Sequence, residues 1–255
     1  MLHCIKTSTF KMEYVESEID CPRLWENHCH GQFEMIAVVA GDINIVLEGK
    51  SYRLTKNQAI IIPPLCYHSV TANERGSYRR ITVLFDVSAI PEVLQSEFAK
   101  DRQEMVIAFS PHIEQLREVC LKAEPSFYAP LIQSLMVQIF YEIIAGSKIS
   151  TNTEVDVFLQ KALQYIDQNL HRKILLDDLA KHTARSKSSF CHLFEQKMHI
   201  SPKQYILQKK FALANKMISE GTSPITAAAQ LGYENYSNFY RLYRKNLGKN
   251  PSSIR

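Results

Sequence analysis

The stretch AAQLGYENYSNF, residues 228–239, decides the fold of the C-terminal part of the chain, because it repeats the layout of LAKHTARSKSSF at residues 179–190. Each copy has a short helix with small residues, a turn, and a second helix that carries Phe in its core. This layout predicts two helix-turn-helix units in tandem, a motif that reads DNA with its second helix. We therefore predict an all-α domain with units at residues 175–198 and 224–247.

Charge is distributed unevenly along the chain. From Val155 onward there are 16 Lys and Arg against 7 Asp and Glu, whereas residues 1–154 carry 14 against 19. A basic C-terminal part favours contact with a phosphate backbone, because bound Lys and Arg release counterions. Together with the polar stretch at residues 146–153, the change in charge predicts two domains, residues 1–150 and residues 151–255.

The sequence gives no sign of export or of a membrane span. The first residues, MLHCIK, lack the basic-then-apolar order of a signal peptide, and no run of about 18 apolar residues occurs. The six cysteines form no CxxC pair, so we expect reduced thiols rather than disulfides. We predict a cytoplasmic protein with no membrane partner and no cofactor.

Apolar periodicity sets out the helices of the C-terminal domain. Residues 156–169 form an amphipathic helix, residues 175–182 and 186–198 form the first unit, and residues 203–219 form one joining helix. Ser186 is a favourable N-cap. The joining helix would be about 25 Å long, a rigid spacer that can hold two recognition helices about 34 Å apart, in successive major grooves.

The outward faces of the two recognition helices supply the predicted DNA contacts. In the first unit these are Arg185, Lys187, Ser188 and His192. The two basic side chains are expected at phosphates, and the hydroxyl and imidazole at base edges. In the second unit the predicted contacts are Tyr236, Ser237, Asn238, Arg241 and Lys245. Arg241 is the best single base contact, because arginine donates two parallel bonds to guanine, with a phosphate clamp or a structural ion pair as open alternatives.

The motif GYxxxSxFxRxYRKxxGxxPxxIR begins at Gly232 and runs to the last residue. On this motif, residues 156–255 resemble the AraC/XylS family of bacterial transcription regulators. Two departures from the family pattern are His199, where glycine is usual, and Lys210, where arginine is common. Gly232 belongs in the turn of the second unit, where a positive φ costs glycine little. The resemblance implies a transcription regulator, with activation as the expected mode, that contacts double-stranded promoter DNA and RNA polymerase.

Short apolar runs of β type fill the sequence between residues 30 and 90. They cover residues 35–40, 43–47, 59–62 and 81–85. Closely spaced runs of this kind predict an all-β barrel or sandwich. The region resembles a cupin-type barrel, the sensor commonly fused to AraC-type domains. The predicted fold class is therefore a two-domain α+β protein, a cupin-like β-barrel with a helical pair followed by the all-α domain.

Residues 111–145 supply that helical pair. One apolar face should cover the barrel, and the second face either pairs with another subunit in a homodimer or is buried within the monomer.

One group of polar residues in the N-terminal region has side chains that can bind a metal ion or a ligand. The motif HxHxxxE, residues 28–34, has the spacing of the first cupin metal motif, and His68 supplies a plausible fourth ligand. Imidazole and carboxylate suit iron, manganese, nickel or zinc. The two glycines of the second cupin motif are replaced by Asn57 and Leu65. We therefore favour a structural or effector-facing cluster over a metal site formed by His28, His30, Glu34 and His68.

A barrel lined in this way is suited to a small molecule such as a sugar. Aromatic rings stack on a sugar ring, and imidazole or carboxylate groups bond its hydroxyls. The predicted effector-binding residues are Trp25, His28, His30, Phe33, Glu34, Tyr67 and His68. For Trp25 or Phe33 taken alone, an ordinary core position is the favoured interpretation.

The sequence thus predicts an effector-responsive transcription regulator that is not an enzyme. Two alternatives stay open: a metal-dependent cupin enzyme fused to a DNA-binding domain, and a constitutive regulator whose barrel only dimerises.

Overall fold

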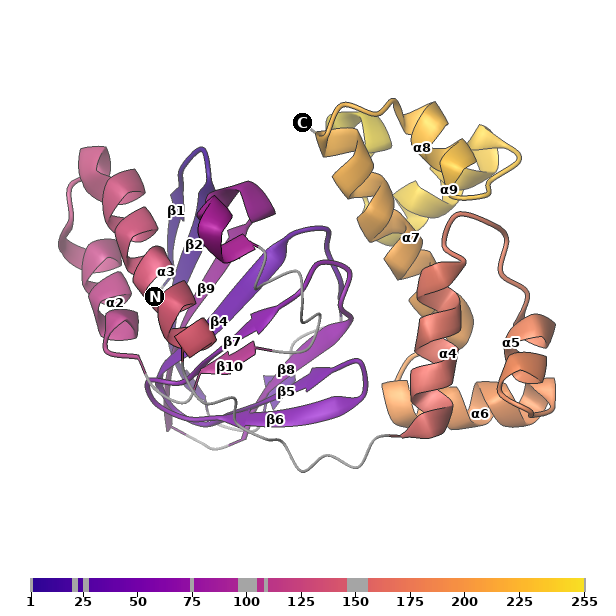
Figure 1. The fold of residues 1–255 in the computed structure, drawn as a ribbon, viewed down its shortest axis with the longest axis horizontal. Helices are drawn as coiled ribbons and strands as arrows, with labels where there is room; N and C mark the ends of the chain where they lie inside the picture. Colours follow the sequence, from indigo (N-terminus) through magenta and orange to yellow (C-terminus); the bar gives the residue numbers. More distant parts are fainter. Residues whose placement is uncertain are drawn as a thin grey trace. The chain divides into compact units, whose positions relative to one another are not determined.

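The computed structural model describes residues 2–19, 23–24, 28–73, 76–95, 105–107, 110–145 and 156–254. They fall into two compact units, one of residues 1–27, 32–47 and 51–152, and one of residues 153–255 together with residues 28–31 and 48–50. Figure 1 shows strands and a helical pair in the N-terminal part of the chain and helices from residue 157 onward. The predicted combination of a β-sheet domain and a helical domain is confirmed.

The N-terminal unit contains two antiparallel sheets. The larger has the order β1-β2-β9-β4-β7-β10, and the smaller has the order β3-β8-β5-β6. The strands are β1 (Leu2–Lys6), β2 (Phe10–Ile19), β3 (Arg23–Leu24), β4 (Phe33–Ala40), β5 (Ile43–Leu47), β6 (Lys50–Leu54), β7 (Ala59–Ile62), β8 (His68–Ala72), β9 (Gly76–Phe85) and β10 (Met105–Ile107). Since hydrogen bonding leaves the two sheets separate over the described strands, the predicted barrel takes a two-sheet form and is not a closed cylinder.

From Met35 onward strand β4 is apolar, because both of its faces are buried there. Met35 and Ala37 join the core that packs on helices, whereas Ile36 and Val38 join the core between the two sheets. Successive side chains of a strand point to opposite faces, so a strand covered on both sides needs an unbroken apolar run. This is the run that the sequence displays from residue 35.

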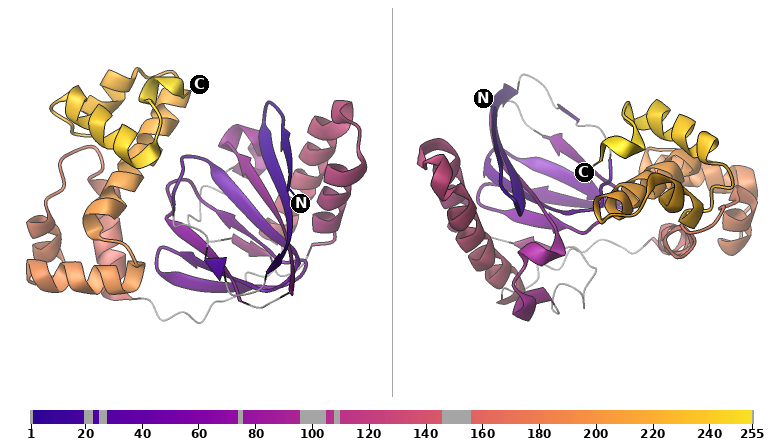
Figure 2. Two further views of the ribbon diagram at one scale, coloured as in Figure 1. Left: turned by 180° about the vertical axis from the view of Figure 1, so that it is seen from behind. Right: turned by 90° about the horizontal axis from the view of Figure 1, so that it is seen from above.

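Helices α2 (His112–Lys122) and α3 (Tyr128–Ala145) cover the outer face of the larger sheet, as both views of Figure 2 show. The Phe140 ring lies 5.1 Å from that of Phe85 on β9. The predicted apolar stripe of α3 is buried in this core except for Leu131, which is 39% exposed. The segment from Pro125 is long and apolar enough to span a membrane, but core helices often share that composition, so this indication is weak.

The C-terminal unit is built from six helices within residues 156–254: α4 (Val157–Gln168), α5 (Leu176–His182), α6 (Lys187–Met198), α7 (Pro202–Ser219), α8 (Pro224–Gln230) and α9 (Tyr236–Leu247). Short 3-10 turns occur at Val87–Ala89, Pro125–Phe127 and Pro251–Ser253. The predicted helices agree with these bounds to within one or two residues. Figure 1 shows α7 running from the helices of the first helix-turn-helix unit to those of the second helix-turn-helix unit.

Aromatic side chains anchor α7 in the cores of both helix-turn-helix units. Tyr205, near its start, meets Phe194 of α6 edge-on, with ring centroids 5.4 Å apart. Phe211, farther along, meets Phe239 and Tyr243 of α9 at 5.9 Å and 5.3 Å. All five side chains are fully buried, so α7 contributes to the hydrophobic core of both helix-turn-helix units.

Side-chain caps fix where the helices begin. The Ser186 hydroxyl accepts a hydrogen bond from the Ser189 backbone N–H at 3.3 Å, as predicted. Ser201 caps α7 and Ser223 caps α8 in the same way, each followed by proline. A capping oxygen satisfies one of the free backbone N–H groups at a helix start, and proline suits the next position because it has no N–H to leave unpaired.

Helix α6 ends at His199, which has a left-handed backbone with φ 54°. Since a side chain is strained in this conformation, we expect His199→Gly to raise the free energy of unfolding by about 1 kcal/mol. Urea denaturation followed by circular dichroism measures the change. Gln196→Gly, at an exposed position inside α6, is the control and should lower stability by about 1 kcal/mol. A loss of stability in His199→Gly would contradict the expectation.

Candidate functional site

The side chains predicted to contact DNA from the first helix-turn-helix unit are exposed on the first recognition helix, α6, or just before it. Arg185, Lys187, Ser188 and His192 are all exposed, while Phe190 and Phe194 are fully buried on the opposite face. Lys187 Nζ lies 3.0 Å from Asp177 Oδ2 on α5. Both side chains of this pair are more than half exposed, and such surface pairs contribute only about 0–1 kcal/mol. Lys187 can therefore exchange this partner for a phosphate at little cost.

The second recognition helix, α9, presents a polar face of the same kind. Ser237, Asn238, Arg241 and Lys245 are exposed. Arg241 Nη2 donates to Asn238 Oδ1 at 3.3 Å, so the guanidinium and the amide lie side by side on one face. These are the side chains that can pair with guanine and with adenine in the major groove.

Tyr236 differs from the other predicted contacts of α9. It is half-buried, and its ring lies 6.0 Å from that of Phe239 and 6.2 Å from that of Tyr240. Burial raises the pKa of its phenol above the ordinary value. Part of this side chain thus belongs to the core of the second unit.

Lys210 of α7 has a structural position that the sequence did not reveal. Its Nζ donates to the backbone oxygens of Arg172 at 2.7 Å and Leu231 at 2.6 Å. It thereby links the loop before α5 to the turn of the second unit. Burial lowers the pKa of this ammonium to about 8. The sequence indicated only that a lysine stands where arginine is common in the family that residues 156–255 resemble, and this does not identify its two acceptors.

In the N-terminal unit, Glu34 of β4 and His68 of β8 approach each other from the two sheets. His68 Nε2 lies 2.9 Å from Glu34 Oε2, and the residues are 1% and 6% exposed. His68 Nδ1 lies 2.9 Å from the Cys66 carbonyl oxygen, which can only accept, so Nδ1 carries a proton. Nε2 then either shares a proton with the Glu34 carboxyl group or offers its lone pair to a cation.

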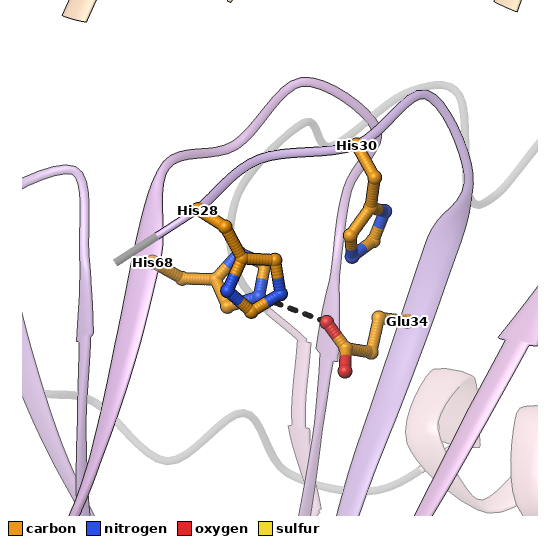
Figure 3. A group of neighbouring side chains, drawn as sticks. All are labelled: His28, His30, Glu34 and His68. Atoms are coloured by element: carbon orange, nitrogen blue, oxygen red, sulfur yellow. Dashed lines mark ion pairs between the residues drawn. The ribbon is translucent and has the colours of Figure 1, made fainter. Parts of the chain in front are cut away.

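Two further histidines complete this group. The ligand atoms of His28, His30, Glu34 and His68 all lie within 4.8 Å of one another. Figure 3 shows the imidazole rings and the carboxylate gathered around one point, with the dashed line joining His68 to Glu34. Three imidazole nitrogens and one carboxylate oxygen are a donor set that fits zinc, iron, manganese or nickel.

The other predicted effector-binding residues do not all join this group. Tyr67 is buried and precedes His68 in the chain. Phe33 lies on the opposite face of β4 from Glu34, where its ring stacks on Phe85 at 5.5 Å. The structure therefore places Phe33 with the helix-covered core, apart from Glu34 and His68. Trp25 lies outside the described residues.

Both the N-terminal and the C-terminal part of the chain are similar in sequence to known protein families. Residues 17–140 match the family model of the AraC-like ligand binding domain, and residues 179–255 match a helix-turn-helix domain. A probable transcriptional regulator, LumQ of Photobacterium leiognathi, is 36% identical over 89 residues, which are 34% of this chain and 36% of LumQ. The matched part thus spans about a third of that relative.

Two other comparisons extend over most of the chain. The uncharacterized HTH-type transcriptional regulator YobQ of Bacillus subtilis is 21% identical over 234 residues, 91% of this chain and 90% of YobQ. The crystal structure of ToxT from Vibrio cholerae has a TM-score of 0.45 at 13% identity, and covers 97% of each chain.

Proposed function

The chain belongs to the AraC/XylS family of DNA-binding transcription regulators, and from this premise we propose that it activates promoters in response to a small molecule. It combines a helix-turn-helix domain with a ligand-binding domain. Beyond membership of the family, we propose the activating role, the residues that contact DNA and the site that binds the effector. We also propose that it acts in the cytoplasm, as a homodimer that contacts RNA polymerase.

The observation that carries the DNA-binding proposal is the anchoring of α7 in both aromatic cores. Two recognition helices fixed on one rigid spacer bind two sites at a defined separation, and about 34 Å corresponds to one turn of duplex. We assign phosphate contacts to Arg185 and Lys187, and base contacts to Ser188 and His192 of the first unit. In the second unit we assign base contacts to Asn238 and Arg241, with Ser237, Lys245 and the exposed edge of Tyr236 beside them.

The effector proposal is supported by the buried polar group between the sheets. Glu34 and His68, with His28 and His30 beside them, offer both hydrogen-bond donors and acceptors to a ligand with several hydroxyls, such as a sugar. A ligand that binds one arrangement of the protein more tightly shifts its population, and such a shift is how effector binding would change promoter binding.

Selection from a random pool of duplex DNA tests the DNA-binding proposal. The full chain is expected to retain sequences with two short conserved elements whose centres lie about one helical turn apart, at physiological salt. Retention that depends on salt but not on sequence would contradict it. Reporter transcription from the selected site, with and without the protein, then distinguishes activation from repression.

A second candidate role, for the group His28, His30, Glu34 and His68, is metal binding, because their four ligand atoms lie within 4.8 Å of one another. Zinc, manganese or iron(II) at tenfold excess over Kd should then raise the free energy of unfolding by about 1.4 kcal/mol, measured by thermal denaturation. Glu34→Gln should abolish the rise, whereas Glu13→Gln, elsewhere in the same unit, should not. Equal metal responses in all three proteins would contradict a site at Glu34.

A further inference from the structure

A cavity of about 450 Å³ lies between the two helix-turn-helix units of the C-terminal domain. Its walls come from the loop before α5, from α5 and α6, from α7, and from the turn and first residues of α9. This size is within the range of small-molecule sites, about 300–1,000 Å³.

The cavity combines an apolar interior with positive charge. Ile174, Leu176, Ile206, Leu207 and Tyr233 supply apolar surface. Four lysines also line it, against two carboxylates: Lys173, Lys187, Lys203 and Lys210, with Asp177 and Glu234. Because Asp177 already pairs with Lys187, the remaining charge of the lining is positive.

Lys210 places a buried ammonium in the wall of this cavity. The residue is 5% exposed, and two of its three N–H donors are used by the carbonyls of Arg172 and Leu231. Within the described residues, no ion pair joins Lys210 to a carboxylate. A buried positive charge without a negative partner is costly, so an anionic group that enters the cavity gains from compensating it.

We propose that this cavity binds a small amphipathic anion, a carboxylate or sulfonate on an apolar body, and that the bound anion competes with DNA. The anionic group faces Lys203 and Lys210 at the wall, and the apolar body lies against Ile206 and Leu207. The competition rests on the DNA contacts proposed above. Lys187 and Asn238 are among those contacts, and both line the cavity.

The dye 8-anilinonaphthalene-1-sulfonate is a suitable probe, because it joins a sulfonate to aromatic rings and fluoresces in apolar surroundings. Titration of the full chain should show saturable binding. Lys203→Glu, at an exposed position on the lining, should weaken binding about tenfold, because it opposes the sulfonate charge. Leu207→Trp, which fills the cavity, should weaken it as well.

Lys216→Glu is the matched control, since it makes the same change on α7 at a residue that does not line the cavity. Circular dichroism melting checks that each variant is folded. Equal affinity in the wild type, Lys203→Glu and Leu207→Trp proteins would overturn the site, as would absence of binding.

DNA affinity measured at increasing dye concentration tests the competition. The apparent Kd for a selected duplex should rise in proportion to dye concentration in the wild type, and much less in Leu207→Trp. An unchanged Kd at saturating dye would overturn the competition. Failure of the dye-free protein to bind any duplex selectively would instead count against the proposed function, and the two failures are therefore distinguishable.

Discussion

Gly232→Ala should lower the free energy of unfolding of the C-terminal domain by about 3 kcal/mol or more, and should abolish selective DNA binding. Gly232 has φ 75°, a conformation that strains any other residue. In addition, an added Cβ would lie 2.6 Å from the carbonyl carbon of Arg172, 2.7 Å from its Cα and 2.8 Å from the nitrogen of Lys173. These are backbone atoms, so the contact is relieved only by separating the turn of the second unit from the first unit.

Gly248→Ala is the matched control for this substitution. Gly248 ends α9 with φ 67°, and nothing lies within 4 Å of its added Cβ. The control therefore has the backbone strain without the collision, and should lose only about 1 kcal/mol. Urea denaturation of both variants measures the difference. Equal losses would show that the close approach of the two units at Gly232 contributes nothing.

Arg241→Ala should weaken binding to a selected duplex by about 1–3 kcal/mol, and should relax the preference at particular base pairs. Arg241 is exposed and bonds only to Asn238 among its described neighbours, so the fold should tolerate the change. Fluorescence anisotropy against the selected duplex and its single-base variants measures affinity and preference together.

Lys245→Ala, one turn farther along α9, is the comparison for Arg241→Ala. A lysine at a phosphate contributes equally to every sequence, so this variant should bind all duplexes more weakly and reduce the salt dependence by about one phosphate contact. The same uniform loss in Arg241→Ala would identify Arg241 as a phosphate contact.

The helices of the C-terminal domain could be predicted closely because each signal is local. Apolar residues at helical spacing and capping residues such as Ser186 act within one turn. The strands were predicted less completely. Runs at residues 43–47 and 59–62 coincide with β5 and β7, but β2 was missed. In β2 the buried residues Phe10, Met12 and Tyr14 alternate with polar ones, so no continuous apolar run marks it.

The candidate site was predictable only in part, for geometric reasons. The spacing of His28, His30 and Glu34 indicated a shared site, and the structure gathers these side chains with His68. Phe33 was grouped with them because an aromatic ring can stack on a sugar, but it adjoins Glu34 on a strand, and neighbours on a strand face opposite ways. Lys210 had no local signal, because its two acceptors, Arg172 and Leu231, lie 38 and 21 residues away along the chain.

Because α7 is anchored in one unit through Tyr205 and in the other through Phe211, the number of residues between these anchors sets the rotation of one unit relative to the other. Each residue of an α-helix turns the chain by about 100° and advances it by about 1.5 Å. One residue inserted between Tyr205 and Phe211 would therefore rotate the second unit around the helix axis by more than a quarter turn, while moving it only slightly along the axis. The recognition helix of that unit would then face away from the duplex. For this family of regulators, the tolerance of α7 to insertions is thus expected to follow whole helical turns rather than distance.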